Sequence, residues 1–317
     1  MYKRQIASCP LRISLFGGST DNPYFVKKYG YGSVISFTCD LKTYVTISQD
    51  KFGFNKDHKY IINYSKREEV SSISEIQNEV VRVVLDHFNM PPVQVTLTSD
   101  AYSQGSGLAS SSSYIISLIK ACSLFLGTKM TETEMCRLAH ELEISFNPYC
   151  GYQDPYGCGI GGFKRIEFMD NYRIKHEFLS TNLFDDFDTH LVFTGVTRNS
   201  KQILKNITEN LEKVEPLLQT VDDAHEAILK NKPIHFLYHM NVGWQQKKKT
   251  SSTITENPKI KEIDEYLTHD ENVLAHKLCG AGNGGFFLTF SNKKTLTLPY
   301  DSVKINVVSE GVLGESV

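Results

Sequence analysis

A glycine- and serine-rich stretch stands directly in front of an apolar run in the middle of the chain. Residues 103–121 read SQGSGLASSSSYIISLIKA, so a polar segment leads straight into residues that should be buried. Such a segment is usually a linker. Before a helix, however, its glycines let the backbone approach a ligand, and the unpaired N–H groups and positive dipole end of the helix attract anions. The stretch therefore indicates a phosphate-binding loop, with helix capping by Ser110 to Ser113 as the alternative.

The composition fits one large globular domain or two smaller ones. The 317 residues are 40% hydrophobic and 22% charged, with a formal net charge of −2. A chain-wide basic surface for nucleic acid is therefore not expected, and no run approaches the ~18 apolar residues of a membrane-spanning helix. The seven cysteines include no C-x-x-C pair, which argues against a disulfide framework or a cysteine zinc site. We expect a cytoplasmic protein without nucleic-acid or membrane partners.

Strands and helices are expected to follow one another irregularly, which favours an α+β class. Two strands are predicted within residues 31–50 and others at 93–100, near 163–168 and near 190–194. Helices are predicted at 75–88, at 114–126, from 131 onward, and around 199–213, 216–230 and 258–268. The Gly- and Pro-rich residues 147–162 are predicted to form a loop. The least patterned region, about 170–188, is the expected domain junction and gives domains of residues 1–178 and 179–317.

Two further glycine-rich motifs lie near the two ends of the sequence. The N-terminal motif CPLRISLFGGSTDNPYF places Arg12 on a strand that runs into Gly17, Gly18 and Asp21. The C-terminal motif KLCGAGNGG matches G-x-G-x-x-G, but a predicted strand follows it, whereas a dinucleotide-binding turn needs a helix there. The Walker A pattern does not occur in the sequence. A nucleotide site on this chain therefore needs a different architecture.

Taken in order, these three motifs resemble those of the GHMP small-molecule kinases. PLRISLFGGSTD, GSGLASSSS and KLCGAGNGG carry the resemblance, which runs from about residue 7 to 290. NYSK at 63–66, FTGVTRNS at 193–200 and GWQQKKKTSSTITENPKI at 243–260 resemble the D-glycero-D-manno-heptose 7-phosphate kinase branch. The resemblance implies two domains: an N-terminal ribosomal-protein-S5-domain-2-like α/β domain with the nucleotide loop, and a C-terminal ferredoxin-like domain.

The resemblance also implies where ATP and Mg²⁺ bind. The residues that match the family's nucleotide loop are Gly105, Ser106, Gly107, Leu108, Ala109, Ser110, Ser111 and Ser112. Ser111 and Glu143 match the magnesium ligands; the alternatives are that Glu141 is the ligand or that Glu143 is a solvated helix residue. The family commonly has glycine where Ala109 stands, and proline before the loop. A methyl group at that position is tolerated at negative φ and disfavoured at positive φ.

By the same resemblance, Asp154 is the catalytic aspartate and Arg12 the cation beside it. An adjacent positive charge favours the ionised carboxylate, which then accepts or orients the proton of a sugar hydroxyl; a plain Asp-Pro turn is the alternative. The residues expected to contact the substrate are Gly18, Thr20, Asp21, Arg198, Gly280 and Gly282. Arg198, Lys66 and the lysines at 247–249 are candidates for a substrate phosphate, although runs of charge are usually solvated. Trp244 is expected in the core.

The implied reaction is transfer of the γ-phosphoryl group of ATP to a sugar hydroxyl. The branch implies the anomeric hydroxyl of D-glycero-D-manno-heptose 7-phosphate, in the synthesis of nucleotide-activated heptose. A kinase for an unphosphorylated sugar, of the galactokinase or fucokinase type, is the alternative enzyme. A non-catalytic sugar sensor on the same fold is the alternative class, and the presence of Ser111, Glu143 and Asp154 argues against it. The sequence leaves open the sugar, the product anomer and homo-oligomer formation.

Overall fold

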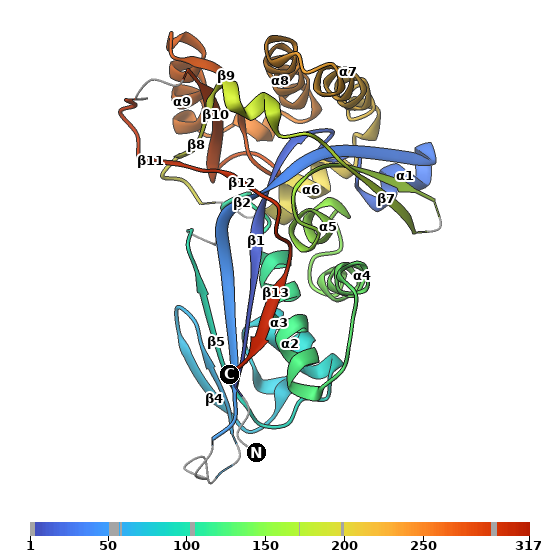
Figure 1. Cartoon of the computed structure of the whole chain (residues 1–317), viewed down its shortest axis with the longest axis vertical. Coiled ribbons are helices and arrows are strands. Elements are labelled where there is room, and N and C mark those ends of the chain that lie inside the picture. Colours follow the sequence, from blue (N-terminus) through green and yellow to red (C-terminus); the bar gives the residue numbers. More distant parts are fainter. Residues whose placement is uncertain are drawn as a thin grey trace.

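Two β-sheets and the helices packed on them make up the described part of the chain (Figure 1). The computed structural model describes residues 4–50, 57, 59–101, 105–170, 172–197, 200–292 and 297–317. Strands and helices follow one another without regular alternation, so the predicted α+β class is confirmed. Among the helices within these ranges, none is long and apolar enough to cross a membrane.

The first sheet is built around two long antiparallel strands, β1 (Arg4–Phe16) and β2 (Tyr31–Ser48). The strand order is β13 (Leu313–Ser316), β1, β2, β5 (Gln94–Ser99), β3 (Tyr60–Asn63) and β4 (Arg67–Val70). The first half of β2 also pairs with β6 (Phe163–Met169) and β12 (Val307–Val308), and β6 pairs with β7 (Arg173–Phe178). The prediction of two strands within 31–50 was wrong, because a single strand changes its neighbour from β6 to β5 halfway along.

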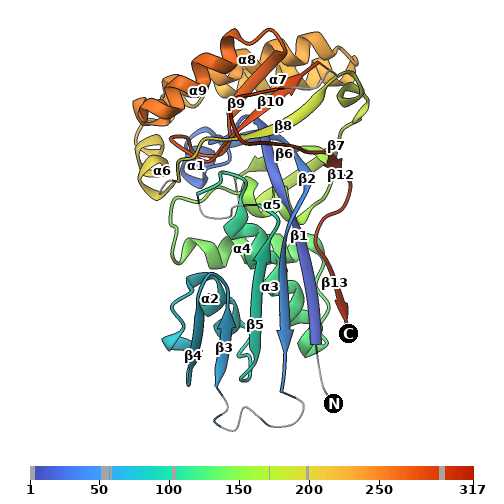
Figure 2. The same ribbon diagram turned by 90° about the vertical axis from the view of Figure 1, so that its left-hand side faces the viewer.

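The second sheet is antiparallel and has the order β11 (Ser302–Lys304), β8 (Asp188–Phe193), β10 (Phe286–Ser291) and β9 (Val273–Leu278). The helices α7 (Leu217–Leu229), α8 (Pro233–Thr250) and α9 (Pro258–His269) lie over it, at the top of Figures 1 and 2. The helix α8 was not predicted, although its buried Phe236, Met240 and Trp244 follow helical spacing. Trp244 is in the core, as expected.

The helices α2 (Glu79–His87), α3 (Ser110–Leu126) and α4 (Glu132–Ile144) belong to the first half, where α3 packs on β1, β2 and β13. The remaining helices are α1 (Pro23–Tyr29), α5 (Gln153–Gly159) and α6 (Ser200–Thr208), with 3₁₀ turns at Ile73–Glu75, Asn182–Asp186, Leu211–Lys213 and Ser252–Thr255. The start of α3 lies four residues earlier than predicted. Ser112 and Ser113 bond to Glu143 and to the carbonyl of Cys9 rather than to their own backbone, so these serines do not oppose the helix.

Residues 147–162 were predicted as a loop but contain α5, so Asp154 stands on a helix. Pro155 lies in its first turn, where a missing N–H costs little. The glycines of α5 allow close packing, since a Cβ on Gly157 would lie 3.0 Å from Cγ of Arg12 and one on Gly159 would lie 2.4 Å from Sγ of Cys136. The predicted loop treats these glycines as turn residues, whereas in the structure they allow close packing.

An apolar cluster joins the two halves of the molecule. It combines Leu11, Phe16 and Phe37 of the first sheet with Phe236 and Phe290 of the second half, and the rings of Phe16 and Phe236 lie 5.4 Å apart. After β11 the chain returns to the first sheet, where β12 pairs with β2 and β13 with β1. The division at residues 178 and 179 stays a prediction.

Gly17 marks a tight contact between the halves and yields a test of the packing. Its φ is +74°, and a Cβ there would lie 2.0 Å from the carbonyl oxygen of Ser33 and 2.6 Å from Cγ2 of Val221 on α7. Gly17→Ala should therefore lower the free energy of unfolding by clearly more than the roughly 1–2 kcal/mol that positive φ costs an L-residue. Gly30→Ala is the matched control, because Gly30 has φ +76° and no described atom lies within 4 Å of its Cβ position. Equal losses in denaturant unfolding would contradict the steric explanation.

Candidate active site

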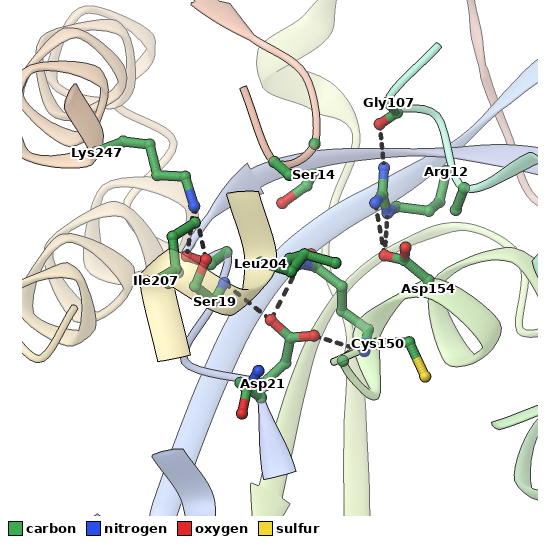
Figure 3. Close-up of a pocket in the computed structure, with 18 of the residues that line it drawn as sticks. Arg12, Ser14, Ser19, Asp21, Gly107, Cys150, Asp154, Leu204, Ile207 and Lys247 are labelled. Carbon is green, nitrogen blue, oxygen red and sulfur yellow. Dashed lines mark hydrogen bonds and ion pairs between the residues drawn. The ribbon is translucent and has the colours of Figure 1, made fainter. Parts of the chain in front are cut away.

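A cavity between the two halves collects most of the residues singled out in the sequence (Figure 3). Its walls come from β1 and the loop after it, the start of α3, the end of α4, α5, α8, and the glycine motif after β9. The predicted site residues that line it are Arg12, Gly18, Asp21, Gly105, Ser106, Gly107, Ala109, Ser110, Ser111, Ser112, Glu143, Asp154 and Gly280. The three sequence motifs therefore meet in one place.

Three predicted site residues within the described ranges do not belong to this lining. The Leu108 side chain is buried in the apolar cluster that joins the halves. Thr20 Oγ1 donates to the carbonyl of Ser33 at 2.8 Å, and Gly282 packs so closely on Ile254 that a Cβ would lie 2.8 Å from its Cα. These residues support the walls of the cavity rather than face it. Arg198 lies outside the described residues, so its predicted role stays a prediction.

Arg12 connects Asp154 to the glycine-serine loop. Its Nε and Nη2 donate to Asp154 Oδ1 at 3.1 and 2.5 Å, and its Nη1 donates to the carbonyl oxygen of Gly107 at 2.7 Å (Figure 3). The Arg12 side chain is 3% exposed and that of Asp154 is 30% exposed. Within the described residues Asp154 Oδ2 accepts no hydrogen bond, so this oxygen faces the cavity available to a ligand.

The loop that Arg12 contacts leaves the start of α3 uncapped. Gly105, Gly107 and Ala109 have φ of +69°, +80° and +61°, so Ala109 adopts the conformation in which a methyl group is disfavoured. No side chain caps α3 at Ala109. The first N–H groups of the helix, at Ser110 and Ser111, therefore remain for an anion that enters the cavity.

Asp21 is buried beneath the N-terminal loop and held by three hydrogen bonds. Its Oδ1 accepts from the backbone N–H of Ser19 at 2.9 Å and from Nε2 of Gln153 at 3.1 Å, and its Oδ2 accepts from the backbone N–H of Gln153 at 3.0 Å. Burial, together with the charge of Asp154, raises the pKa of Asp21 to about 6. Sequence reasoning missed Gln153, whose only signal was its place directly before Asp154.

Glu143 lies at the inner side of α4 against the start of α3. Its Oε2 accepts a hydrogen bond from Ser112 Oγ at 2.5 Å, and burial, reinforced by the charge of Asp154, raises its pKa to about 7. Glu141, the alternative ligand, is exposed and pairs with Arg137. The hydroxyl that donates to this carboxylate belongs to Ser112. Ser111, predicted as a magnesium ligand together with Glu143, lines the same cavity, and its role stays a prediction.

The carboxylate oxygens of Glu143 and the serine hydroxyls at the start of α3 fit a hard cation such as Mg²⁺. Mg²⁺ is commonly held by one or two carboxylates together with substrate phosphates and water. In the described part of the chain, no group of three or more His, Cys, Asp or Glu side chains forms a closed metal site, so further ligands would come from a bound nucleotide. A cation would also supply the counter-charge that the buried Glu143 carboxylate needs when it is ionised.

Three buried polar atoms on the cavity wall make no hydrogen bond within the described residues. They are Ser14 Oγ, Asn147 Oδ1 and Gln153 Oε1. Two of these side chains meet at Gly18, where a Cβ would lie 3.3 Å from Ser14 Oγ and 3.5 Å from Gln153 Nε2. Buried polar groups without partners are rare and destabilising. Their concentration here indicates that a polar ligand or water completes the cavity.

Of the lysine run at 247–249, only Lys247 lines the cavity. Its Nζ donates to Ser19 Oγ at 2.6 Å, whereas Lys248 pairs with Asp264 and Lys249 is exposed. The expectation that the lysines of this run are solvated is therefore wrong for Lys247. Lys277 also lines the cavity and was missed, although a lysine inside the apolar strand before GAGNGG was a signal.

Comparison with known proteins finds relatives among the GHMP kinases. Residues 75–162 match the GHMP kinases N terminal domain, and this segment contains the glycine-serine loop, Glu143 and Asp154. A Campylobacter jejuni relative, D-glycero-alpha-D-manno-heptose 7-phosphate kinase, is 27% identical over 301 residues, which cover 89% of this chain and 87% of the relative. These matches agree with the resemblance to the GHMP kinases that the three motifs carry.

Solved structures agree with this resemblance. A D-glycero-D-manno-heptose 1-phosphate kinase from Bacteroides thetaiotaomicron matches this chain with a TM-score of 0.77 at 22% identity and covers 99% of both chains. The Streptococcus pneumoniae phosphomevalonate kinase, in complex with phosphomevalonate and AMPPNP, matches with a TM-score of 0.73 at 13% identity over 92% of each chain. The two-domain GHMP fold implied by the motifs is therefore confirmed. The sequence matches to kinases given above show that the chain is an enzyme of the kinase class.

The raised pKa of Glu143 predicts how the stability of this kinase depends on pH. Because the pKa in the folded state, about 7, lies above the ordinary value of 4.5, the folded state retains the proton longer and its stability falls as pH rises through this window. Glu143→Gln removes this pH-dependent loss of stability and keeps an oxygen that accepts the hydrogen bond from Ser112 Oγ. Without Mg²⁺, its melting temperature should exceed that of the wild type at pH 8 and match it near pH 4.5.

Glu141→Gln, on the exposed side of the same helix, is the control for this experiment and should show no pH-dependent gain. An increase for Glu143→Gln of the same size at both pH values would contradict the burial of a titrating carboxyl group.

Proposed function

We propose that this GHMP kinase transfers the γ-phosphoryl group of ATP to the anomeric hydroxyl of D-glycero-D-manno-heptose 7-phosphate, for nucleotide-activated heptose synthesis. The observation that supports a sugar is the set of unpaired polar atoms, Ser14 Oγ, Asn147 Oδ1 and Gln153 Oε1, on the wall of the cavity that Asp21 also lines. A polyhydroxylated acceptor supplies the hydrogen bonds that these atoms lack. The activity named for the Campylobacter jejuni relative supports heptose phosphate as that acceptor.

Asp154 is the proposed group on the acceptor side of the reaction. Phosphoryl transfer depends on positioning and charge stabilisation more than on covalent catalysis. Arg12 fixes Oδ1 of Asp154, which leaves Oδ2 to accept or orient the proton of the attacking hydroxyl. The same guanidinium also donates to the carbonyl of Gly107. It therefore holds Oδ2 of Asp154 in a fixed position relative to the glycine-serine loop.

The loop at 105–112 and the uncapped start of α3 are the proposed seat of the ATP phosphates. Glu143 with the hydroxyls of Ser111 and Ser112 is the proposed protein share of the Mg²⁺ site, and the ion offsets phosphate charge when it is bound. The AMPPNP in the Streptococcus pneumoniae phosphomevalonate kinase structure is consistent with a nucleotide in this fold.

Asp154→Asn tests the catalytic assignment. With ATP, Mg²⁺ and the heptose 7-phosphate, kcat should fall about a hundredfold or more, because a general base of this kind contributes at least that much, while KM for ATP should change little. Glu141→Gln serves as the control carboxylate outside the cavity. A kcat close to that of the wild type would remove Asp154 from the acceptor side.

The wild-type enzyme distinguishes the alternatives when it is assayed on a panel of acceptors. Preference for galactose, fucose or the unphosphorylated heptose would replace the proposal with a kinase of the galactokinase or fucokinase type. Binding of a sugar without turnover of any acceptor would instead support a sugar sensor.

Ser14→Ala tests the proposed contact with the acceptor. Loss of one neutral hydrogen bond should raise KM for the acceptor by roughly two- to tenfold and leave KM for ATP unchanged. Ser36→Ala is the matched control, since Ser36 pairs with Ser14 across β1 and β2 and also has an unpaired buried hydroxyl, but does not line the cavity. An equal effect of both variants on acceptor KM would argue against the contact.

A further inference from the structure

Two lysines from the second half of the molecule reach into the acceptor side of the cavity. Lys247 of α8 donates through Nζ to Ser19 Oγ at 2.6 Å, and Lys277 of β9 donates through Nζ to the carbonyl oxygen of Leu15 at 2.7 Å. Both therefore meet the segment that joins the end of β1 to Asp21. Figure 3 shows Lys247 and Arg12 on opposite sides of the cavity, with Ser14 and Asp21 between them.

The charges around these lysines favour an anion. Lys277 forms no ion pair within the described residues, and its hydrogen bond to a carbonyl occupies one of three N–H donors. Burial lowers the pKa of Lys277 to about 7, and the positive charges of Lys247 and Arg12 act in the same direction. Positive groups gathered in a buried space are stabilised when an anion with several acceptor oxygens joins them.

An anion held by these two lysines lies apart from the proposed seat of the ATP phosphates. The N–H groups at the start of α3 and the loop at 105–112 lie beside Arg12, whose charge is already paired with Asp154. The lysines instead stand next to Ser19, whose N–H binds Asp21, and next to Ser14 with its unpaired hydroxyl. The second anionic group therefore lies on the side of the cavity that the proposed function gives to the acceptor.

We propose that Lys247 and Lys277 bind the phosphate group that the acceptor already carries, while its hydroxyls contact Asp21, Ser14 and Gln153. This inference rests on the proposed function, because only a phosphorylated acceptor brings such a group. It makes the two lysines the specificity determinants that separate a sugar phosphate from the corresponding free sugar.

Lys247→Met and Lys277→Met test the inference, with Lys249→Met as the matched control on the exposed face of α8. Methionine keeps an unbranched apolar stem and removes the charge. Calorimetric titration without ATP should show each cavity variant binding D-glycero-D-manno-heptose 7-phosphate about ten- to a hundredfold more weakly, as expected for one lost charge-assisted hydrogen bond. Binding of unphosphorylated heptose and KM for ATP should change less than twofold, and Lys249→Met should match the wild type.

The outcomes separate this inference from the proposed function. If the wild type prefers unphosphorylated heptose, the proposed function fails and the inference fails with it. If the wild type prefers the phosphate and both cavity variants bind it as well as Lys249→Met does, the inference alone is wrong. A rise in KM for ATP without a change in acceptor binding would assign the lysines to the donor phosphates. Should Lys277→Met not fold, Lys247→Met and Lys277→Arg, which keeps the charge and should retain binding, decide the question.

Discussion

The buried guanidinium of Arg12 is the interaction on which the arrangement of this cavity depends. A cation with almost no exposure must be surrounded by acceptors, and Arg12 obtains them from the glycine-serine loop and from α5. The glycine at position 157 lets α5 approach the stem of the same side chain. The conformation of the loop, the position of α5 and the orientation of Asp154 are therefore set together, and a change in any one of them disturbs the other two.

Two other carboxyl groups of the cavity, Asp21 and Glu143, have no such cation beside them, and burial disfavours their ionised forms. The pKa values of Asp21 and Glu143 are raised to about 6 and about 7, so Glu143 takes up a proton near neutral pH and Asp21 at slightly acidic pH. A ligand that brings a cation to Glu143 favours its ionised form and displaces a proton. Ligand binding, protonation and stability are thereby coupled through the same buried groups.

The sequence predicted where the motifs meet better than it predicted which side chains face the cavity. Glycine-rich loops and isolated charges identify a site, but neighbouring residues of one motif point to opposite sides. Leu108 and Thr20 are thus buried in the wall next to residues that line it, and of the neighbouring serines at the start of α3 it is Ser112 whose hydroxyl bonds to Glu143. Likewise, only tertiary contacts reveal that the glycines of α5 serve packing rather than turns. Ser14 and Lys277 are single polar residues within apolar strands, and their importance depends on what the fold places opposite them.

The pairing of β13 with β1 has a consequence for how this protein is made. Gln5 lies opposite Ser316, and β13 covers the outer edge of β1 over four residues. Because ribosomes synthesise proteins from the N-terminus, that edge remains uncovered until residues 313–316 have been translated and have returned to the first sheet. An open strand edge is a template for pairing with other chains. Residues 5–8 of the strand that carries Arg12 therefore offer an open edge to other chains until β13 has paired with them.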